Sequence, residues 1–415
     1  RQRQMCIRDR RSVATAPRAP RRLAGTQLAE GERRPRLRSG CGKNRGLVNS
    51  RQFASTVWPM RILYGVVGEG MGHATRSSVL LQHLTEQHDV HIVVSGRARD
   101  YLAQRFENVH KIWGLTIQYE GNSVRKLGTL LENLKGAVKG FPENVRTYFD
   151  LVDEFQPQVV VSDFESFSYL YGKNHMLPVI SVDNMQIINR CSHEPELLAG
   201  VEGDFELTRN IVRSKLPGCF HYLISSFFQP PLRKQRTSLL PSILRPEILT
   251  ARSEPGEHLL VYQTSTTNSR LLEALEQSGL PCRVYGVRRG IKQDEVEGSL
   301  TYRPFSESSF IDDLRTARAV VAGGGYTLMS EAVYLRKPML SLPVEGQFEQ
   351  TLNALYLQQL GYGRHAQALD AQTLESFLSD VPRCAEALQG YTQDGNRLML
   401  EALDRQLELG TSVKL

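Results

Sequence analysis

The chain has 415 residues, of which 40% are hydrophobic and 23% are charged, so it is long enough for two domains with separate cores. Its net charge is +7, but residues 1–59 hold 15 Lys and Arg against 3 Asp and Glu, which leaves 36 against 41 for residues 60–415. The excess of positive charge therefore belongs to the first 59 residues. The rest of the chain is slightly acidic, so its charge gives no reason to expect nucleic-acid binding.

Membrane spans and cysteine frameworks are not indicated by the sequence. No apolar run approaches the ~20 residues of a transmembrane helix. The six cysteines are scattered, with no C-x-x-C pair, which indicates reduced thiols rather than a disulfide or zinc framework. We therefore expect a cytoplasmic protein.

Residues 1–59 form an arginine-rich segment with no apolar period, so we expect them to be disordered. Such a composition is also typical of a transit peptide. However, Met60 directly precedes a strand pattern, and the letters QMCIRDR near the start resemble translated sequencing-adapter sequence. We expect the native chain to begin at Met60 and the segment before it to be spurious.

The first predicted strand, residues 60–67, is followed by a glycine-rich turn and by a helical pattern over residues 74–86. Gly70 and Gly72 lie in that turn and permit close approach to the backbone. The third glycine comes too early for a dinucleotide-binding fingerprint. His73 is at the start of the helix, and because histidine titrates near neutral pH it is a candidate general base for a hydroxyl. The alternative is that His73 only caps the helix or binds phosphate.

Two carboxylates follow a later predicted strand, residues 158–163. In an open α/β sheet, ligands gather at the carboxyl ends of the strands. Asp163 and Glu165 are therefore candidates for orienting His73 or for acting as the base in its place. The alternative for Asp163 is that it caps the helix that begins at Ser166.

The chain then divides into further predicted regions. We expect an N-terminal domain over residues 60–240, a linker with several prolines over 241–256, a second domain over 257–392 and a final helix over 393–415. The loop after the second domain's first strand is rich in hydroxyl groups, and Thr264, Ser265 and Thr266 could donate to phosphate. Their alternative role is helix capping.

The most informative stretch runs from Ala319 to Ala354. A short buried strand leads into Gly323, Gly324 and Gly325, then into a helix over 326–335 and a second strand over 339–342. This strand–turn–helix–strand unit implies a parallel sheet with a right-handed crossover.

The residue types in this stretch suit a nucleotide sugar. The helix N-terminus, where Tyr326 and Thr327 lie, favours a diphosphate because its N–H groups are unpaired. Glu331, one turn further on, can accept two hydrogen bonds from the hydroxyls of a ribose. A set of amide and acid groups follows the second strand and suits an uncharged sugar; its members are Gln347, Glu349, Gln350 and Asn353.

The order GGG-Tyr-Thr-(x)2-Ser-Glu, then Lys-Pro, then Glu-Gln-(x)2-Asn-Ala resembles the donor-binding signature of GT-B glycosyltransferases. It is similar to the bacterial transferase that adds GlcNAc to lipid-linked muramyl-pentapeptide, to UDP-sugar glucosyl- and glucuronosyltransferases, and to uncharacterised archaeal and bacterial glycosyltransferases with a GEGQFEQ-like segment. The resemblance implies two doubly wound, Rossmann-like parallel-sheet domains that face a cleft.

The resemblance also implies roles for individual residues. Glu331 would hold the ribose, and Glu349 with Gln350 would hold the sugar. The backbone at Phe310 and Ile311 would meet uracil, or these residues would simply pack in the core. The glycine–histidine turn would face the acceptor, which places Gly70, Gly72 and Glu165 on the acceptor side. The final helix would cross back to the first domain.

The function that follows is transfer of a hexose or N-acetylhexosamine from a nucleoside diphosphate sugar, with UDP expected, to an acceptor hydroxyl. No D-x-D motif offers a metal cradle, so we expect inversion without a metal and no cofactor other than the UDP-sugar substrate. Expected acceptors are a glycolipid, a cell-wall precursor or a small molecule, with contact to the inner face of the membrane as an alternative to a freely cytoplasmic protein. The rival functions are a UDP-GlcNAc 2-epimerase type of isomerase and a non-catalytic sugar-nucleotide sensor.

Overall fold

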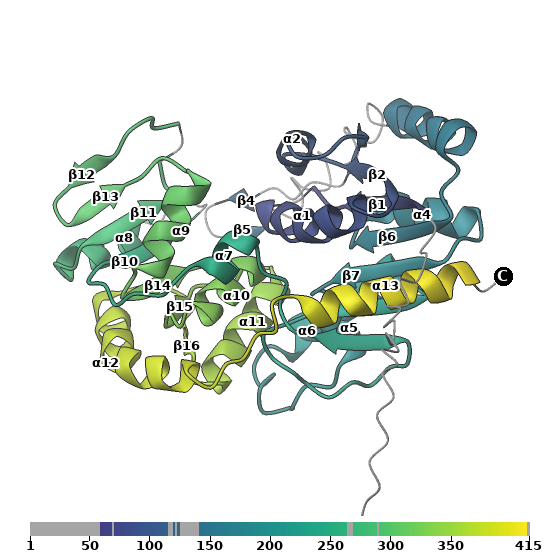
Figure 1. The fold of residues 1–415 in the computed structure, drawn as a ribbon. Coiled ribbons are helices and arrows are strands. Elements are labelled where there is room, and N and C mark those ends of the chain that lie inside the picture. Colours follow the sequence, from purple (N-terminus) through teal and green to yellow (C-terminus); the bar gives the residue numbers. More distant parts are fainter. Residues whose placement is uncertain are drawn as a thin grey trace, which may run out of the picture. The chain divides into compact units, whose positions relative to one another are not determined.

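Two seven-stranded sheets, both largely parallel, form the framework of the part of the chain that the structure describes (Figure 1). The structure is a computed structural model, and it describes residues 59–68, 70–114, 119–120, 123–124, 141–263, 269–288 and 290–412. The first 58 residues lie outside this set, and so do Thr264, Ser265 and Thr266, whose expected phosphate contacts stay a prediction.

The first sheet has the strand order β3-β2-β1-β6-β7-β8-β9, and every neighbouring pair is parallel. Every residue of β6 and β7 is buried, as expected for a parallel sheet that is covered on both faces. The strands are β1 Arg61–Val66, β2 Asp89–Val94, β3 Val109–Lys111, β6 Val159–Asp163, β7 Val179–Asp183, β8 His221–Ser225 and β9 Thr237–Leu240.

The second sheet has the order β12-β13-β11-β10-β14-β15-β16. Its pairs are parallel except for β12 with β13, which is antiparallel at the edge. The strands are β10 Leu259–Tyr262, β11 Cys282–Tyr285, β12 Glu295–Glu297, β13 Leu300–Tyr302, β14 Ala319–Ala322, β15 Met339–Ser341 and β16 Gly363–His365. The predicted pair of doubly wound parallel sheets is confirmed.

Each sheet has one point where the strand order reverses, and ligands of open α/β sheets bind at such points. In the first sheet it lies between β1 and β6, where Val66 pairs with Asp163. In the second it lies between β10 and β14, where Tyr262 pairs with Ala322. The two glycine-rich turns follow β1 and β14 directly, so the fold puts both at reversal points.

Helices cover the faces of both sheets. They are α1 Met71–Thr85, α2 Ala98–Ala103, α4 Ser166–Asn174, α5 Ile187–Arg190, α6 Glu202–Lys215, α7 Pro246–Thr250, α8 Ser269–Gln277, α9 Glu307–Arg315, α10 Tyr326–Tyr334, α11 Phe348–Gln359, α12 Ala371–Leu388 and α13 Arg397–Ser412. A short antiparallel pair, β4 Tyr119–Glu120 and β5 Ser123–Val124, lies apart from the two sheets. Among the described residues, no helix combines the length and the apolar character needed to cross a membrane.

Two helix starts differ from the sequence prediction. Helix α1 begins at Met71 rather than at residue 74, because Gly70 takes a left-handed φ of 83° and turns the chain into the helix there. His73 is thus the third residue of α1. The sequence also predicts that residues 310–314 start a helix, but α9 begins at Glu307, so Phe310 lies one turn inside it.

Between β3 and β6 the prediction is confirmed only in part. The sequence predicts a strand within residues 107–120, and the described residues of this stretch form the strands β3, Val109–Lys111, and β4. The sequence also predicts a polar, helical stretch over residues 121–155. Of its described residues, 141–150 are helical and are followed by a π-helical turn, Leu151–Phe155, whereas Ser123–Val124 form β5.

The last helix returns to the first sheet. Met399, Leu403 and Leu407 of α13 belong to the same buried cluster as Ile62 of β1, and α13 runs beside β7 and β6 in Figure 1. Two chain segments therefore join the sheets, one from β9 to β10 and one from α12 to α13. They are hydrogen-bonded to each other, because the amide of Asn396 pairs with the backbone N–H and C=O of Leu244 at 2.9 and 2.7 Å. The expected domain limits themselves stay a prediction.

Candidate active site

The two glycine-rich turns are in direct contact. Thr327, in the first turn of α10, donates its hydroxyl to the carbonyl oxygen of Gly72 in α1 at 3.1 Å. A Cβ added to Gly72 would come within 2.8 Å of that hydroxyl, so a glycine lets the helices approach this closely. The structure thus brings together the predicted acceptor turn and the predicted donor turn.

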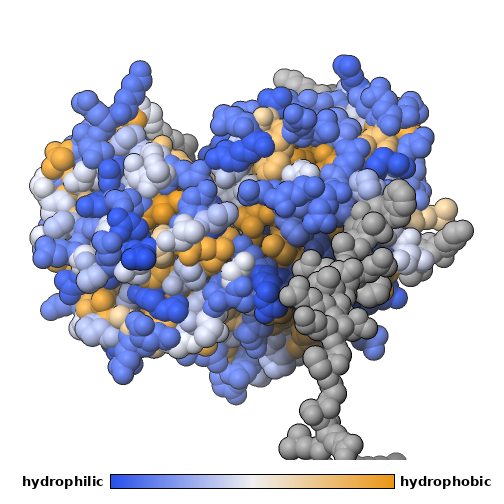
Figure 2. All heavy atoms as spheres, in the orientation of Figure 1, coloured by the Kyte–Doolittle hydropathy of each residue, from blue (hydrophilic) through white to orange (hydrophobic). Residues whose placement is uncertain are grey.

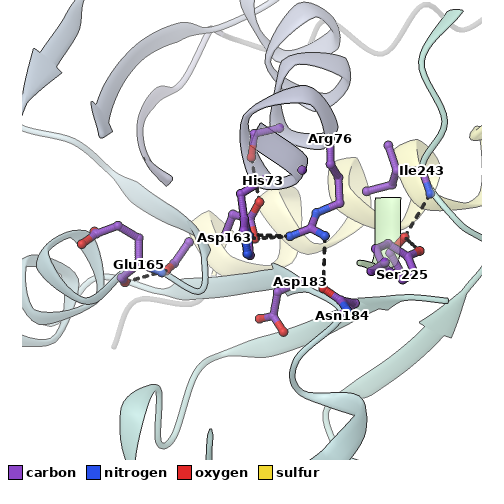
Figure 3. A network of polar contacts seen from close by, with 12 residues as sticks. His73, Arg76, Asp163, Glu165, Asp183, Asn184, Ser225 and Ile243 are labelled. Carbon is purple, nitrogen blue, oxygen red and sulfur yellow. Dashed lines mark hydrogen bonds and ion pairs between the residues drawn. The ribbon is translucent and has the colours of Figure 1, made fainter. Parts of the chain in front are cut away.

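His73 and Asp163 form a hydrogen-bonded pair at the end of β6 (Figure 3). The Nδ1 atom of His73 lies 2.9 Å from Oδ1 of Asp163. The His73 side chain is 21% exposed, whereas that of Asp163 is 1% exposed. With Nδ1–H donating to the carboxylate, the Nε2 atom keeps its lone pair and can accept a proton.

Asp163 has further partners that hold it as a carboxylate. Arg76 Nη2 lies 2.5 Å from Oδ1, and the Ser77 hydroxyl donates to Oδ2 at 2.9 Å. Burial alone would raise the pKa of Asp163, but the charges of Arg76 and His73 and their hydrogen bonds outweigh it and lower the pKa to about 2. The helix-capping alternative for Asp163 is therefore wrong, because its oxygens are committed to α1.

Glu165 is the residue that caps helix α4. Its carboxylate accepts from the backbone N–H groups of Phe167 at 2.7 Å and Ser168 at 2.6 Å. Burial raises its pKa, and the hydrogen bonds from Ser168 and Phe167 oppose that rise. Glu165 points away from His73 in Figure 3, so of the two candidate carboxylates it is Asp163 that contacts the histidine. An acceptor-side role for Glu165 stays a prediction.

Arg76 is buried at 3% exposure between the two sheets. Besides Asp163, it reaches Asn184 Oδ1 through Nη1 at 3.2 Å, and its guanidinium carbon lies 5.7 Å from the ring centroid of Tyr326. Asn184 in turn donates from Nδ2 to Glu349 Oε1 of the second sheet's helix α11 at 2.8 Å. A continuous polar chain therefore runs from His73 to Glu349.

On the donor side, the glycine turn packs against the first turn of α11. A Cβ on Gly324 would fall 2.3 Å from the carbonyl oxygen of Gln350, so only glycine fits there. The Gly324 N–H donates to Gln350 Oε1 at 3.1 Å. A Cβ added at Gly323 would lie 3.1 Å from Oε1 of Gln350, whereas one added at Gly325 would meet nothing within 4 Å. Close packing thus fixes the backbone of the turn at Gly324, whereas there is free space around Gly325 at the N-terminus of the helix.

The predicted sugar-binding group is assembled as one network. Glu349 Oε1 also accepts from Asn353 Nδ2 at 2.9 Å, and the same amide donates to the Gly324 carbonyl at 3.1 Å. Gln350 donates to the Gln347 side chain. The four residues named for the sugar therefore lie together at the start of α11, next to the glycine turn.

Tyr326 faces the interior rather than an open site. Its hydroxyl contacts the Ser225 hydroxyl at 2.6 Å and donates to Ser242 at 2.9 Å, and burial raises its pKa. Phe310 and Ile311 are also buried, at 6% and 8% exposure, and Phe310 packs edge-on against Tyr285. Their side chains fill the core, which leaves the backbone role at uracil as a prediction.

Glu331 is held by a residue that the sequence did not indicate. Arg245, from the segment between the two sheets, donates from Nε and Nη2 to the two carboxylate oxygens of Glu331 at 2.7 and 2.8 Å. Its Nη1 donates to Glu307 at 2.7 Å. Burial raises the pKa of Glu331, and Arg245 opposes that rise. Glu331 is only 2% exposed, so its ribose role stays a prediction.

A cavity of about 440 Å³ lies beside this ion pair. Its walls come from both sheets' helices, and they include Ser78, Val79, Gln82, Thr85, Glu86, Tyr101, Arg105, Phe106, Arg245, Pro246, Glu247 and Glu307. The surface is also hollowed between the parts that carry α9 and α2 (Figure 2). The Arg245–Glu331 pair is therefore next to a space that a small ligand could enter.

Comparison with known proteins identifies the family. The model of glycosyl transferase family 1 matches residues 60–382. The chain belongs to glycosyl transferase family 1. It is similar to an uncharacterized glycosyltransferase of Methanosarcina mazei, with 26% identity over 340 residues, which are 74% of this chain and 85% of the relative. A second relative, from Methanosarcina acetivorans, is 24% identical over 342 residues and covers the same shares.

Solved glycosyltransferases share the fold of this family member. The glycotransferase of kitacinnamycin superposes with a TM-score of 0.59 at 15% identity, over 84% of this chain and 99% of that one. Acinetobacter baumannii MurG superposes with a TM-score of 0.54 at 15% identity, over 83% and 99%. The expected GT-B fold and the expectation of a glycosyltransferase enzyme are both confirmed.

Two functional candidates in this glycosyltransferase were missed by the sequence reasoning. Arg76 lies three residues after His73 on α1, so helical spacing was a signal that could have found it. Arg245 sits 86 residues before Glu331 in an irregular segment, where local spacing gives no signal. Within the described residues, no group of three or more His, Cys, Asp or Glu side chains is close enough to hold a metal ion; metal independence stays a prediction.

Proposed function

We propose that this glycosyltransferase moves a hexose or N-acetylhexosamine from a nucleoside diphosphate sugar, with UDP as the carrier, to an acceptor hydroxyl, by inversion and without a metal ion. The observation that carries the proposal is the His73–Asp163 pair, 2.9 Å apart, at the reversal point of the first sheet. The helix bearing His73 contacts the predicted donor helix through Gly72 and Thr327.

In this proposal His73 is the general base. Its Nδ1–H donates to Asp163, so Nε2 takes the proton of the acceptor hydroxyl while the acceptor oxygen bonds to C1 of the sugar. The bond from C1 to the diphosphate oxygen breaks, and its electron pair leaves with the nucleoside diphosphate. Because the acceptor enters opposite the leaving group, the anomeric configuration inverts. Asp163 stabilises the imidazolium that forms.

Asp163 is the weaker candidate for the base itself. Its pKa of about 2 makes it a weak base that takes up a proton poorly at neutral pH, and its side chain is 1% exposed. His73 is the member of the pair that reaches solvent, at 21% exposure. The structure therefore supports Asp163 as the group that orients His73.

On the donor side, the start of α10 offers backbone N–H groups and the positive end of a helix dipole to the diphosphate. Such groups stabilise the charge that develops on the leaving group, and they can do so in place of a metal. Glu349 and Gln350 would then bind the sugar. Glu331 would hold the ribose, provided that Arg245 shares or releases its carboxylate.

For the acceptor we propose a glycolipid, a cell-wall precursor or a small molecule, with contact to the inner face of a membrane if the acceptor is a lipid. A protein of the same fold was solved as a spinosyn rhamnosyltransferase with spinosyn aglycone, which is a small-molecule acceptor. The fold is thus compatible with binding a small molecule of this kind.

The test begins with the donor. Thermal shift with UDP, UDP-glucose, UDP-GlcNAc and the corresponding GDP- and dTDP-sugars would select the base and the sugar. UDP release is then measured with membrane and soluble extracts. We expect release only when an acceptor-containing extract is present. An epimer formed from the donor alone, detected by NMR, would show an isomerase instead, and tight donor binding without release in any extract would show a sensor.

A further inference from the structure

Arg76 occupies an unusual position for a charged side chain. It is 3% exposed, and its Nε atom has no hydrogen-bond partner among the described residues. Burying a guanidinium with an unpaired N–H is costly. The contacts of its two Nη atoms must offset that cost, and these contacts lead to two different functional groups.

The first contact fixes the orientation of Asp163. Arg76 Nη2 and His73 Nδ1 both converge on Oδ1, at 2.5 and 2.9 Å, and the two nitrogens lie 2.8 Å apart. A guanidinium can only donate, so with the proton on Nδ1 the two nitrogens do not bond to each other, and both donate to Oδ1. Ser77 holds the other oxygen at 2.9 Å. Arg76 and Ser77 together determine which way the carboxylate faces.

The second contact leads into the second sheet. Arg76 Nη1 donates to Asn184 Oδ1 at 3.2 Å, and Asn184 Nδ2 donates to Glu349 Oε1 at 2.8 Å. Asn184 is 4% exposed. Because its amide oxygen accepts from Arg76, its amide nitrogen is directed at Glu349. Glu349 is thus linked, through Asn184, to the same guanidinium that orients Asp163.

We propose that Arg76 and Asn184 are positioning residues that couple the general base His73 to the sugar-binding carboxylate Glu349. Movement of Glu349 on sugar binding is passed through Asn184 and Arg76 to Asp163 and hence to His73. The coupling rests on the proposed function for the roles of His73 and Glu349, but the physical link between them can be tested without activity.

The first experiment reads the link by NMR. The protein is labelled with ¹³C at histidine Cε1, and the His73 signal is assigned with His73→Gln. We expect the His73 signal to shift in Glu349→Gln and in Asn184→Leu. The His73 signal should not shift in two matched control variants. Glu345→Gln removes an exposed charge from the loop just before α11, and Asn189→Leu alters another asparagine that is 4% exposed.

The NMR test is completed by Arg76→Lys. A lysine keeps the positive charge but has one ammonium group, which cannot bridge Asp163 and Asn184 as a guanidinium does. In the Arg76→Lys background, Glu349→Gln should no longer move the His73 signal. An equal shift in both backgrounds, or no shift in Asn184→Leu, would overturn the coupling.

The second experiment measures calorimetric affinities for UDP and for the UDP-sugar selected by thermal shift. Asn184→Leu should weaken UDP-sugar binding roughly tenfold or more, as for a lost charge-assisted hydrogen bond, and leave UDP binding unchanged. Equal losses for UDP and UDP-sugar would contradict a link through Glu349. A wild-type protein that binds neither would instead overturn the proposed function, while the NMR result would still decide whether the link exists.

Discussion

Arg245 donates hydrogen bonds to both carboxylate oxygens of Glu331, from Nε at 2.7 Å and from Nη2 at 2.8 Å. The arginine comes from the segment that joins the two sheets, and the glutamate is on the helix that follows the glycine turn. The residue with the most specific donor role in the family resemblance is therefore tied to the link between the domains, and this pair can be probed by substitution.

Replacing Arg245 by Met should lower the free energy of unfolding by about 3–5 kcal/mol, because Glu331 would be left charged and buried without its partner. Urea denaturation followed by circular dichroism measures this. Arg315→Met, which breaks more exposed ion pairs with Glu254 and Asp312, should cost less than about 1 kcal/mol. The double variant Arg245→Met/Glu331→Met should regain much of the loss. Similar losses of unfolding free energy in Arg245→Met and Arg315→Met would mean that the buried pair stabilises the fold no more than the exposed ones.

Replacing Glu331 by Gln should weaken UDP binding by about 1.5–3 kcal/mol if the carboxylate accepts from the ribose hydroxyls. Calorimetry measures the UDP affinity of the variant, after circular dichroism has shown that the variant is folded. Glu307→Gln is the matched control, because it changes the other carboxylate bound by Arg245 and leaves Glu331 in place. Unchanged UDP affinity in Glu331→Gln would refute the ribose role.

Asp163 should make stability depend on pH at the acid end. Its pKa falls from 3.8 to about 2 on folding, so its contribution is present above the ordinary pKa and is lost as the pH drops through the folded value. At ~1.4 kcal/mol per pKa unit, the contribution is about 2–3 kcal/mol. Unfolding free energies between pH 5 and pH 2 should fall less steeply for Asp163→Asn than for the wild type. Parallel curves would speak against the lowered pKa.

Replacing His73 by Gln should reduce turnover by about 10²–10⁴, the usual range for a lost general base. Donor affinity should stay unchanged, because the proposed donor contacts lie on the second sheet. UDP release with the active extract and calorimetry with the donor give the two values. A variant with normal turnover would remove His73 from the mechanism, and a variant that loses donor affinity would move it to the donor site.

Turnover should persist in excess EDTA, because the proposed stabilisation of the leaving diphosphate comes from the N-terminus of α10. The measurement is the rate of UDP release before and after dialysis against the chelator. Loss of activity that Mn²⁺ or Mg²⁺ restores would require a metal in the mechanism. A control with the chelator's calcium complex would separate metal removal from other effects of the reagent.

The sequence predicted the framework well because apolar runs and helical spacing are local signals. The strand–glycine turn–helix–strand unit that begins at Ala319 formed as expected, and so did the placement of His73 beside a carboxylate. Local signals could not decide which carboxylate it would be. Asp163 and Glu165 are two residues apart, and their different fates depend on Arg76 and Ser77, which come from a helix far back in the chain.

Long-range packing explains the other differences. Gly324 must be glycine because the backbone of Gln350 lies against it. From the sequence alone, the same glycine indicates only a ligand-binding turn. Arg245 reaches Glu331 from an irregular segment, where no period marks it. Residues of this kind become visible only when the fold has placed distant segments side by side.

The hydrogen bonds between Asn396 and Leu244 have a mechanical consequence. In the chain, the second sheet lies between two crossings, and hydrogen bonds join these crossings at Asn396 with Leu244 and at Gln393 with Ser242. Because the two crossings are hydrogen-bonded to each other, we expect them to move together as one connection. We expect any relative movement of the two sheets to be smallest near Asn396, and such a movement would strain the polar chain from His73 to Glu349.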